Sequence, residues 1–308
     1  MPSLAQIRAS NLSTAGSLAY RPVAVFVGGT AGIGAGMARA FARHRNGDAH
    51  IVLVGRNRAA AEAVLASFPK PAGKEPQHEF VECDLTLMRN VRKTTAELRA
   101  RLPRVNFLVL SPGIMTLDGR TESDEGIDRK MALHYYARWR FTYDLIPSLQ
   151  AAKDAGEDAK VMSVLSAGTG EAGEMDLEDL GLKHSYSLSM CARACSTYND
   201  LMVQAFAEKY PDLAFTHAAP GVVSTNLMDG IAKSHWSGRI LSPLGTALAC
   251  VVGISAEDCG DYMWHGLYAG AKGWFRRNRH GEDIGDKNIW STPEAKTKLW
   301  EHTLEVTS

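Results

Sequence analysis

The segment Val23–Gly34, VAVFVGGTAGIG, constrains the fold more than any other part of the chain. Five apolar residues lead into glycines at 28, 29, 32 and 34, and apolar side chains at 33, 37, 40 and 41 then recur at helical spacing. This order predicts a buried strand that turns tightly into an amphipathic helix. Glycine permits positive φ and close approach of a ligand, and a helix N-terminus attracts anions. The segment therefore predicts a phosphate-binding turn, although an ordinary strand-to-helix turn has the same composition.

The spacing Gly28-x-x-x-Gly32-x-Gly34 resembles the TGxxxGIG turn of the short-chain dehydrogenase/reductase family, with Val27 in place of the usual threonine. The resemblance covers about residues 21–270 and implies a fold of the Rossmann type. The chain is similar to divergent members of secondary-metabolite pathways that lack the lysine of the Tyr-x-x-x-Lys motif. Its further motifs are Asp84-Leu85, Ser166, Tyr186 and Pro220–Thr225, the last of which matches PGxVxT.

Further apolar runs predict strands at 50–54, 80–85, 105–110, 161–165 and 213–218, with helices between them. This alternation predicts an α/β doubly wound fold, and the resemblance implies the Rossmann type, with a parallel sheet of about seven strands in the order 3-2-1-4-5-6-7. We expect a single domain over residues 1–308, with a lead-in at 1–20 and a C-terminal extension at 271–308. The lead-in either packs outside the first strand or stays partly disordered.

Composition narrows the class of partner. Lysine plus arginine and aspartate plus glutamate each total 34, and the pI is about 7.1. No net field draws such a chain to nucleic acid or to anionic lipid, so small neutral molecules fit better. The five cysteines include no C-x-x-C pair, which favours buried thiols and no metal site.

No apolar run is long enough to span a bilayer, because 241–255 is interrupted by Pro243, Gly245 and Gly253. The N-terminus lacks the apolar core of a secretory signal. We therefore expect a cytoplasmic protein, as a monomer or homodimer, that does not engage a membrane.

The end of the second strand predicts which cofactor binds. In a dinucleotide-binding fold, an acidic residue here holds the 2′-hydroxyl of NAD, whereas an arginine fits the 2′-phosphate of NADP. Arg56 and Asn57 stand at this point, and no acidic residue does. We therefore expect NADP(H), although an arginine at a strand end can also be simply solvated.

The resemblance implies further cofactor contacts. In the family the Asp-Leu pair seats the adenine ring, and the threonine of PGxVxT meets the nicotinamide carboxamide. Ser111-Pro112-Gly113 stands where the family has Asn-Ala-Gly, and the proline removes a donor. The expected cofactor-binding residues are Gly28, Thr30, Gly32, Ile33, Gly34, Arg56, Asn57, Asp84, Leu85, Ser111, Gly113, Pro220, Gly221, Val223 and Thr225.

The resemblance also implies the catalytic residues Ser166, Tyr186 and His134. Ser166 follows the fifth strand, at the sheet edge where doubly wound folds bind ligands, and Tyr186 is expected to open the next helix. His134 stands near the family's asparagine, where it can relay a proton or be a core histidine held by one hydrogen bond. Met190 takes the place of the family's lysine, one turn after Tyr186, and supplies no charge. Tyr186 should then stay protonated at neutral pH.

Three segments have a composition but no motif. Residues 168–184 form an acidic loop that either lines the active site or is solvated surface. Residues 226–252, with Met228, His235, Trp236 and Leu241, are expected to form an apolar lid over the substrate. The basic residues at 276, 277, 279 and 280 are interpreted as a solvated hairpin rather than a docking site for an acidic partner.

Three functions remain open. The favoured one is NADPH-dependent reduction of a ketone or imine on a bulky apolar molecule in biosynthesis, with Ser166 polarising the acceptor and Tyr186 supplying the proton. The second is a non-redox cyclisation, isomerisation or dehydration on the same scaffold, suggested by the missing lysine and asparagine. The third is a non-catalytic NADP-binding protein, for which the same losses speak.

Overall fold

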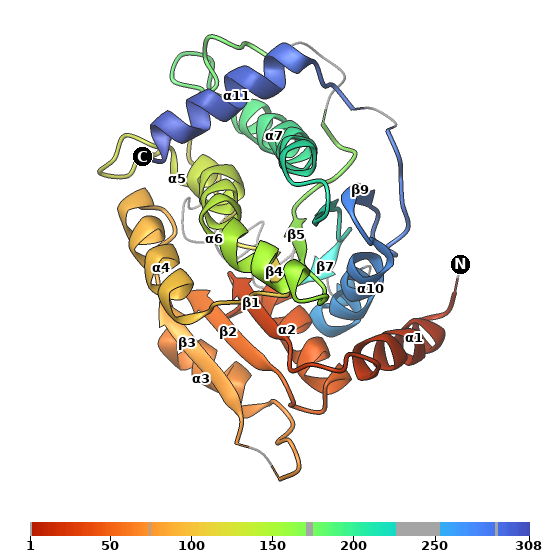
Figure 1. The fold of residues 1–308 in the computed structure, drawn as a ribbon. Helices are drawn as coiled ribbons and strands as arrows, with labels where there is room; N and C mark the ends of the chain where they lie inside the picture. The colour runs from red at the N-terminus through yellow and green to blue at the C-terminus, as the bar shows by residue number, and fades with distance from the viewer. Residues whose placement is uncertain (1, 74, 171–174, 226–252, 287–288) are drawn as a thin grey trace.

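The computed structural model describes residues 2–73, 75–170, 175–225, 253–286 and 289–308. Seven parallel strands form its main sheet in the order β3-β2-β1-β4-β5-β6-β9 (Figure 1), which confirms the predicted fold class and strand order. The central strands β1 and β4 carry unbroken apolar sequences, as parallel strands between two helix layers require. The strands are β1 Val23–Val27, β2 His50–Gly55, β3 Gln77–Glu82, β4 Phe107–Leu110, β5 Lys160–Val164, β6 Ala214–Ala218 and β9 Gly273–Arg277.

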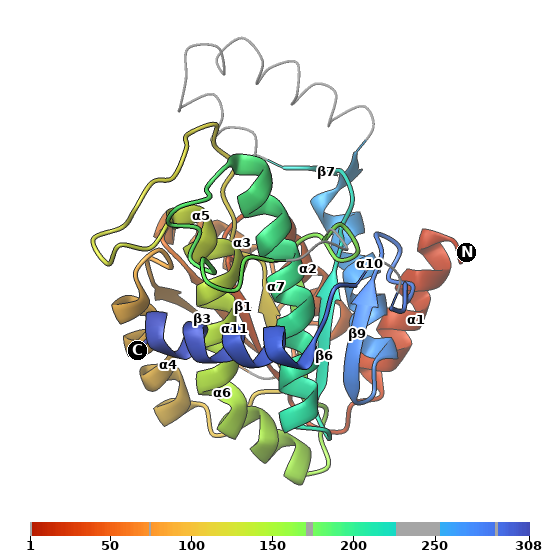
Figure 2. The same cartoon turned by 90° about the horizontal axis from the view of Figure 1, so that it is seen from above.

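Helices cover both faces of this sheet. Helices α4, α6 and α7 lie on one face, and α11 crosses α7 on the outside of that layer (Figure 2). Helices α2, α3 and α10 lie on the other face. None of the helices in the described ranges is long and apolar enough to cross a membrane. The helices are α1 Leu4–Gly16, α2 Gly32–His44, α3 Arg58–Ala66, α4 Met88–Arg101, α5 Arg129–Met131, the π-helix η1 Ala132–Tyr136, α6 Ala137–Asp154, α7 Leu188–Lys209, α10 Ala256–Ala269 and α11 Pro293–Val306.

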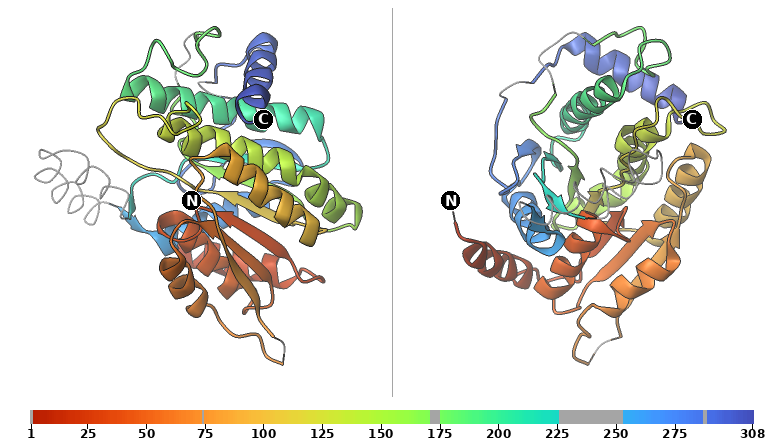
Figure 3. Two further views of the ribbon diagram at one scale, coloured as in Figure 1. Left: turned by 90° about the vertical axis from the view of Figure 1, so that its left-hand side faces the viewer. Right: turned by 180° about the vertical axis from the view of Figure 1, so that it is seen from behind.

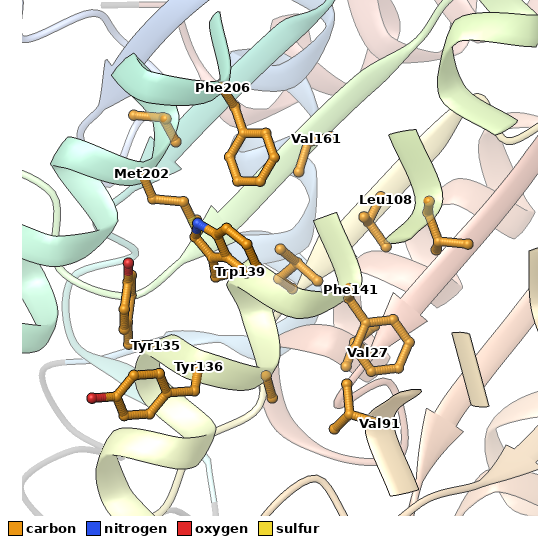
Figure 4. Packing of buried hydrophobic residues seen from close by; sticks show 14 of the residues in the cluster. Val27, Val91, Leu108, Tyr135, Tyr136, Trp139, Phe141, Val161, Met202 and Phe206 are labelled. Atoms are coloured by element: carbon orange, nitrogen blue, oxygen red, sulfur yellow. The ribbon is translucent and has the colours of Figure 1, made fainter. Parts of the chain in front are cut away.

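An aromatic cluster joins η1 and α6 to α7 (Figure 4). The Trp139 ring centroid lies 5.8 Å from that of Phe206 on α7 and 5.0 Å from that of Trp300 on α11. Large aromatic rings bury much apolar surface and favour such tilted contacts. The cluster therefore fixes the helix that carries His134 against the helix that follows Tyr186.

The chain reverses its direction of winding between β1 and β4. Strand β1 pairs with β2 on one side and with β4 on the other, and the two halves of the sheet grow outward from this pair. The connections that leave β1 and β4 therefore diverge, and a cleft opens at the carboxyl ends of the strands. The glycine-rich turn after β1 and the loops after β4, β5 and β6 all lie at this edge.

The N-terminal lead-in is mostly a helix. A capping box between Ser3 and Gln6 begins α1, which packs on α10 and α2 (Figure 3). Its Arg8 donates to the buried carboxylate of Asp261 at 2.8 Å, and His44 of α2 contacts the same carboxylate at 2.9 Å. A partner distant in the sequence thus anchors a helix whose own apolar pattern is weak.

The basic segment near residue 276 forms a hairpin, in which Arg277 pairs antiparallel with Asp283 and Arg279 is exposed, but Arg276 and Arg277 are buried, which corrects part of our interpretation. Residues Gly273–Arg277 form β9, the seventh strand of the sheet, so the expected C-terminal extension contributes to the core. Arg276 is fully buried, and its Nε lies 3.2 Å from Oδ1 of Asp200 on α7. Local charge counting could not show this, because the counterion comes from another part of the chain. Helix α11 begins at Pro293, as predicted.

Candidate active site

The glycine-rich turn connects β1 to α2 with backbone geometry that only glycine adopts easily. Gly28 has φ +80° and Gly32 has φ +53°. A Cβ at Gly34 would lie 2.4 Å from the carbonyl oxygen of Gly28, so Gly34 closes the turn rather than facing a ligand. Ala31 is the N-cap of α2, and no side chain caps the helix. The amides of the first turn are therefore available to an anion.

A cavity of about 450 Å³ begins at this turn and extends along the carboxyl edge of the sheet. Thirteen of the predicted cofactor-binding and catalytic residues line it, and they come from five different connections of the fold. These residues are Gly28, Thr30, Gly32, Ile33, Arg56, Leu85, Ser111, Gly113, His134, Pro220, Gly221, Val223 and Thr225. The rest of the wall consists of residues that were not predicted as site residues: Ala31, Gly55, Pro112, Leu133, Arg138, Val164 and Leu165.

Two predicted cofactor residues turn away from the cavity toward their own backbone. The side chain of Asn57 accepts the amide of Ala60 at 3.0 Å and caps α3. The side chain of Asp84 accepts the amide of Thr86 at 3.0 Å. Short Asx side chains at helix starts and turns commonly bond nearby amides. At this end of the cavity the structure leaves Arg56 and Leu85 on the wall.

The two arginines after β2 have different surroundings. Arg58 lies 3.5 Å from Glu82 and stacks 5.0 Å from the ring centroid of Phe80. Arg56 is exposed at the cavity mouth, and no carboxylate of the described residues lies within ion-pair distance of it. An unpaired guanidinium beside a helix N-terminus suits a phosphate.

His134 lies on the cavity wall near the end of β4. Its Nε2 accepts the amide of Ile114 at 3.2 Å, so the neutral ring carries its proton on Nδ1. Burial, together with the nearby charges of Arg138 and Lys130, lowers the pKa of His134 to about 3. The ring is therefore neutral at physiological pH and is held by a hydrogen bond to the backbone, while it lines the cavity.

Arg138 lies one turn after His134 and is almost fully buried. Its guanidinium donates to backbone carbonyls at the ends of β4 and β5 and to the hydroxyl of Ser163 at 2.8 Å. The Ser163 hydroxyl in turn donates to Asn199 Oδ1 at 2.6 Å, and Asn199 Nδ2 donates to the carbonyl of His134. This network holds β5, α7 and η1 together under the cavity floor. In the sequence, the only sign of this network is an arginine within an otherwise apolar helical face.

Ser166 does not line the cavity, although its neighbour Leu165 does. The Ser166 amide donates to Nε2 of His217 at 3.2 Å, and Nδ1 of His217 lies 2.6 Å from Oδ1 of Asp200. Arg276 bonds the same carboxylate oxygen. These three side chains are fully buried, or nearly so, and come from β6, α7 and β9. They fix the backbone of Ser166 from below.

Tyr186 precedes helix α7 instead of opening it, which corrects our expectation. Ser187 is the N-cap, with extended backbone, and its side chain accepts the amide of Met190 at 3.1 Å. Since Tyr186 lies outside the helix, it does not share a helical face with Met190, whose side chain is 37% exposed. Helical spacing therefore does not by itself place the Met190 side chain beside Tyr186.

The Tyr186 side chain packs beside the buried Cys191, and neither Tyr186 nor Met190 lines the cavity. Burial raises the pKa of Tyr186 above 10, and the Lys130 Nζ lies 5.7 Å from its ring centroid. Its hydroxyl is buried beside the Cys191 thiol. The phenol is protonated at neutral pH.

The loop after β5 is described at 168–170 and 175–184, and this part does not line the cavity. Asp179 accepts the amides of Lys183 and Ser185, and the hydroxyl of Tyr198 donates to Leu180 O at 3.0 Å. The loop thus packs on α7. The expected lid at 226–252 lies outside the described residues. The described segments before and after it pair as two short parallel strands, β7 Val223–Ser224 and β8 Ile254–Ser255.

Metal and thiol chemistry find little support in the described residues. Cys83, Cys191, Cys195 and Cys259 are buried free thiols, as expected, and Cys250 lies outside the described ranges. In the described part of the chain no three histidine, cysteine or acidic side chains gather as a metal site would require.

The fold and the cavity define an α/β protein of the Rossmann type with its ligand cavity at the switch point of the sheet. Residues 22–175 match the short chain dehydrogenase family model. The chain is 36% identical over 228 residues to "Oxidoreductase AN1596" of Emericella nidulans, covering 74% of this chain and 65% of that protein. It is 33% identical over 263 residues to "Oxidoreductase andH" of Emericella variicolor, covering 85% of this chain and 74% of that protein.

The chain belongs to the short-chain dehydrogenase family. A solved structure titled as an NADPH-bound carbonyl reductase from chicken fatty liver superposes with a TM-score of 0.59 at 18% identity, over 89% of this chain and all of that one, and shows the same fold. Membership in a dehydrogenase family, with relatives named as oxidoreductases, makes oxidoreductase the class of enzyme that these findings support.

Proposed function

We propose that the protein is an NADPH-dependent reductase of a ketone or imine on a bulky, mostly apolar molecule. The observation that carries this proposal is the cavity itself, which joins an uncapped helix N-terminus to an unpaired arginine at one end and an apolar wall at the other. Leu133, Val164 and Leu165 form much of that wall, and apolar walls favour apolar substrates.

The chain's own residues divide the work of binding. The amides of Gly32 and Ile33 would hold a pyrophosphate, and Arg56 would hold the 2′-phosphate that distinguishes NADPH. Leu85 would contact the adenine, and Pro220, Val223 and Thr225 would face the nicotinamide half. Bound NADPH supplies the hydride.

The proton has two candidate donors among the described residues. Tyr186 is protonated at neutral pH, but its hydroxyl is buried beside Cys191 and its side chain lies off the cavity wall. The Nδ1–H of His134 belongs to a ring on the wall, but its low pKa makes it a hydrogen-bond donor rather than an acid. Ser166, fixed through its amide, would polarise the acceptor only if its hydroxyl reaches the substrate.

Cofactor preference tests the first part of the proposal. An arginine–phosphate contact contributes about 1.5–3 kcal/mol, so Arg56→Ala should weaken NADPH binding about ten- to hundredfold and leave NADH binding unchanged. Arg58→Ala is the matched control, because Arg58 already pairs with Glu82. Calorimetry that finds equal losses in both variants, or no preference for NADPH in the native protein, would contradict the assignment.

A non-redox function is favoured by one observation, the position of Ser166 and Tyr186 away from the cavity wall. Incubation with (4R)- and (4S)-deuterated NADPH and a panel of ketones separates the two functions. Deuterium in the product supports the reductase. Product that forms without consumption of NADPH supports a cyclase, isomerase or dehydratase, and tight binding without any product supports a non-catalytic protein.

A further inference from the structure

The arginine under the cavity floor is held by neutral groups. The Nε of Arg138 donates to Leu133 O at 3.0 Å, and its Nη1 donates to Leu110 O at 3.2 Å, Ser163 Oγ at 2.8 Å and Val164 O at 2.8 Å. Its Nη2 donates to Pro112 O at 2.5 Å. The described residues accept only this one bond from Nη2, which carries two N–H groups. Since Arg138 lines the cavity, a bound ligand can accept the other.

No described carboxylate lies within ion-pair distance of this guanidinium. The buried Lys130, earlier in the same segment, is different, because its Nζ lies 3.9 Å from Asp128 and donates to Gly119 O. Arginine keeps its charge at neutral pH even when buried. Arg138 therefore brings to the cavity a fixed positive charge with no paired negative group in the described residues, and such a charge acts strongly on whatever binds beside it.

The place of Arg138 along the cavity identifies which part of a ligand it meets. Arg56 and Leu85 mark the end near β2 and β3, and the glycine-rich turn lies at β1. Arg138 bonds the carboxyl ends of β4 and β5, on the far side of that turn. Resting on the proposed function, this order places the adenosine half of the cofactor near Arg56 and the nicotinamide half near Arg138.

We propose that Arg138 binds the nicotinamide half of the cofactor and biases the site toward its reduced form. The nicotinamide ring of NADP⁺ carries a positive charge, whereas the dihydronicotinamide ring of NADPH carries none, and the rest of the two molecules is the same. A fixed positive charge beside the ring disfavours NADP⁺ selectively. Two unit charges about 10 Å apart in a partly buried site correspond to about a tenfold difference in affinity.

The experiment measures dissociation constants by calorimetry for NADPH, NADP⁺ and 2′,5′-ADP, which lacks the nicotinamide half. In Arg138→Gln, which keeps a donor but removes the charge, the affinity ratio of NADPH to NADP⁺ should fall about tenfold while 2′,5′-ADP binds as before. Arg138→Lys should keep most of the native ratio. Arg140→Gln is the control on the same helix, because Arg140 is paired with Asp144 at 2.9 Å.

The outcomes separate this inference from a merely structural role for Arg138. A folded Arg138→Gln protein with an unchanged ratio, or with 2′,5′-ADP weakened as much as NADPH, overturns the inference. If Arg138→Gln does not fold, Arg138→Lys decides by pH, because a buried ammonium loses its proton at lower pH than a guanidinium. Burial lowers the pKa of the Arg138 guanidinium to about 9, so the ratio of Arg138→Lys should fall at lower pH than the native ratio, and an identical pH dependence in both proteins overturns the inference.

Arg56→Ala can be told apart from Arg138→Gln, because Arg56→Ala should weaken the binding of NADPH and of 2′,5′-ADP by the same factor. Native protein that binds neither ligand contradicts the proposed function itself. Native protein that binds both, with the ratio insensitive to Arg138, contradicts only the role assigned to this arginine.

Discussion

The two ends of the cavity are built from different parts of the chain. At the glycine-rich end the backbone forms the wall, since Gly28 and Gly32 adopt positive φ and the first turn of α2 presents its amides. At the other end side chains form the wall, among them the apolar Leu133, Val164 and Leu165 and the polar His134 and Arg138. Backbone geometry is encoded by the spacing of glycines, whereas a side-chain wall depends on which helix packs there. The first end therefore resembles its family closely, and the second departs from it.

The side-chain end should be the more sensitive to acid. Burial holds the pKa of His134 at about 3, below its ordinary value of 6.5, so the folded protein binds fewer protons than the unfolded chain between these values. The associated stability is complete above about pH 6.5 and is lost as the pH falls toward 3, by about 3–5 kcal/mol. His134→Asn should flatten the pH dependence of the unfolding free energy by up to about 1.4 kcal/mol per pH unit.

Urea unfolding at a series of pH values measures this slope. His184→Asn, the same substitution at an exposed histidine, is the control. If the unfolding free energy depends on pH equally in both variants, His134 is not the acid-sensitive group. The two ends of the cavity would then not differ in their sensitivity to acid.

The backbone end should depend on space as well as on φ. A Cβ at Gly28 would lie 2.6 Å from the nitrogen of Pro112. Gly28→Ala therefore combines a strained φ with a steric clash against the backbone of Ser111 and Pro112. We expect a loss of about 2–4 kcal/mol in unfolding free energy and a loss of NADPH binding. Gly126→Ala has a similar φ of +72° but open space around its Cβ, and it should cost about 1 kcal/mol. Equal losses would mean that the contact with Pro112 is unimportant.

The smallest effect is expected at Met190, although the family comparison made it the most conspicuous departure. Its side chain is 37% exposed and lies beyond the N-cap that separates it from Tyr186. Met190→Lys should change stability by less than about 0.5 kcal/mol and leave the pH–rate profile of reduction unchanged. If the pH at which the rate profile bends instead falls by one unit, the new ammonium lies beside Tyr186, and the start assigned to α7 is wrong.

The residues of the helix after β5 show why part of the site could not be predicted. A spacing of four residues places two side chains on one face only if both lie in the helix. Whether Tyr186 or Leu188 comes first is decided by Ser187, which caps the helix through its own side chain. The sequence contains three serines near this point, Ser185, Ser187 and Ser189, and pattern alone does not choose between them.

By itself, the sequence determined the alternation of strands and helices and the glycine-rich turn, because apolar periodicity and glycine spacing act over a few neighbouring residues, whereas the strand order was predicted from the resemblance to a family of known fold. Only the tertiary structure decided that Arg276 is buried against Asp200, that His217 holds the amide of Ser166, and that Arg138 reaches the cavity wall. Each of these contacts joins residues far apart in the sequence. Burial of a polar side chain depends on partners that only folding brings within hydrogen-bond distance.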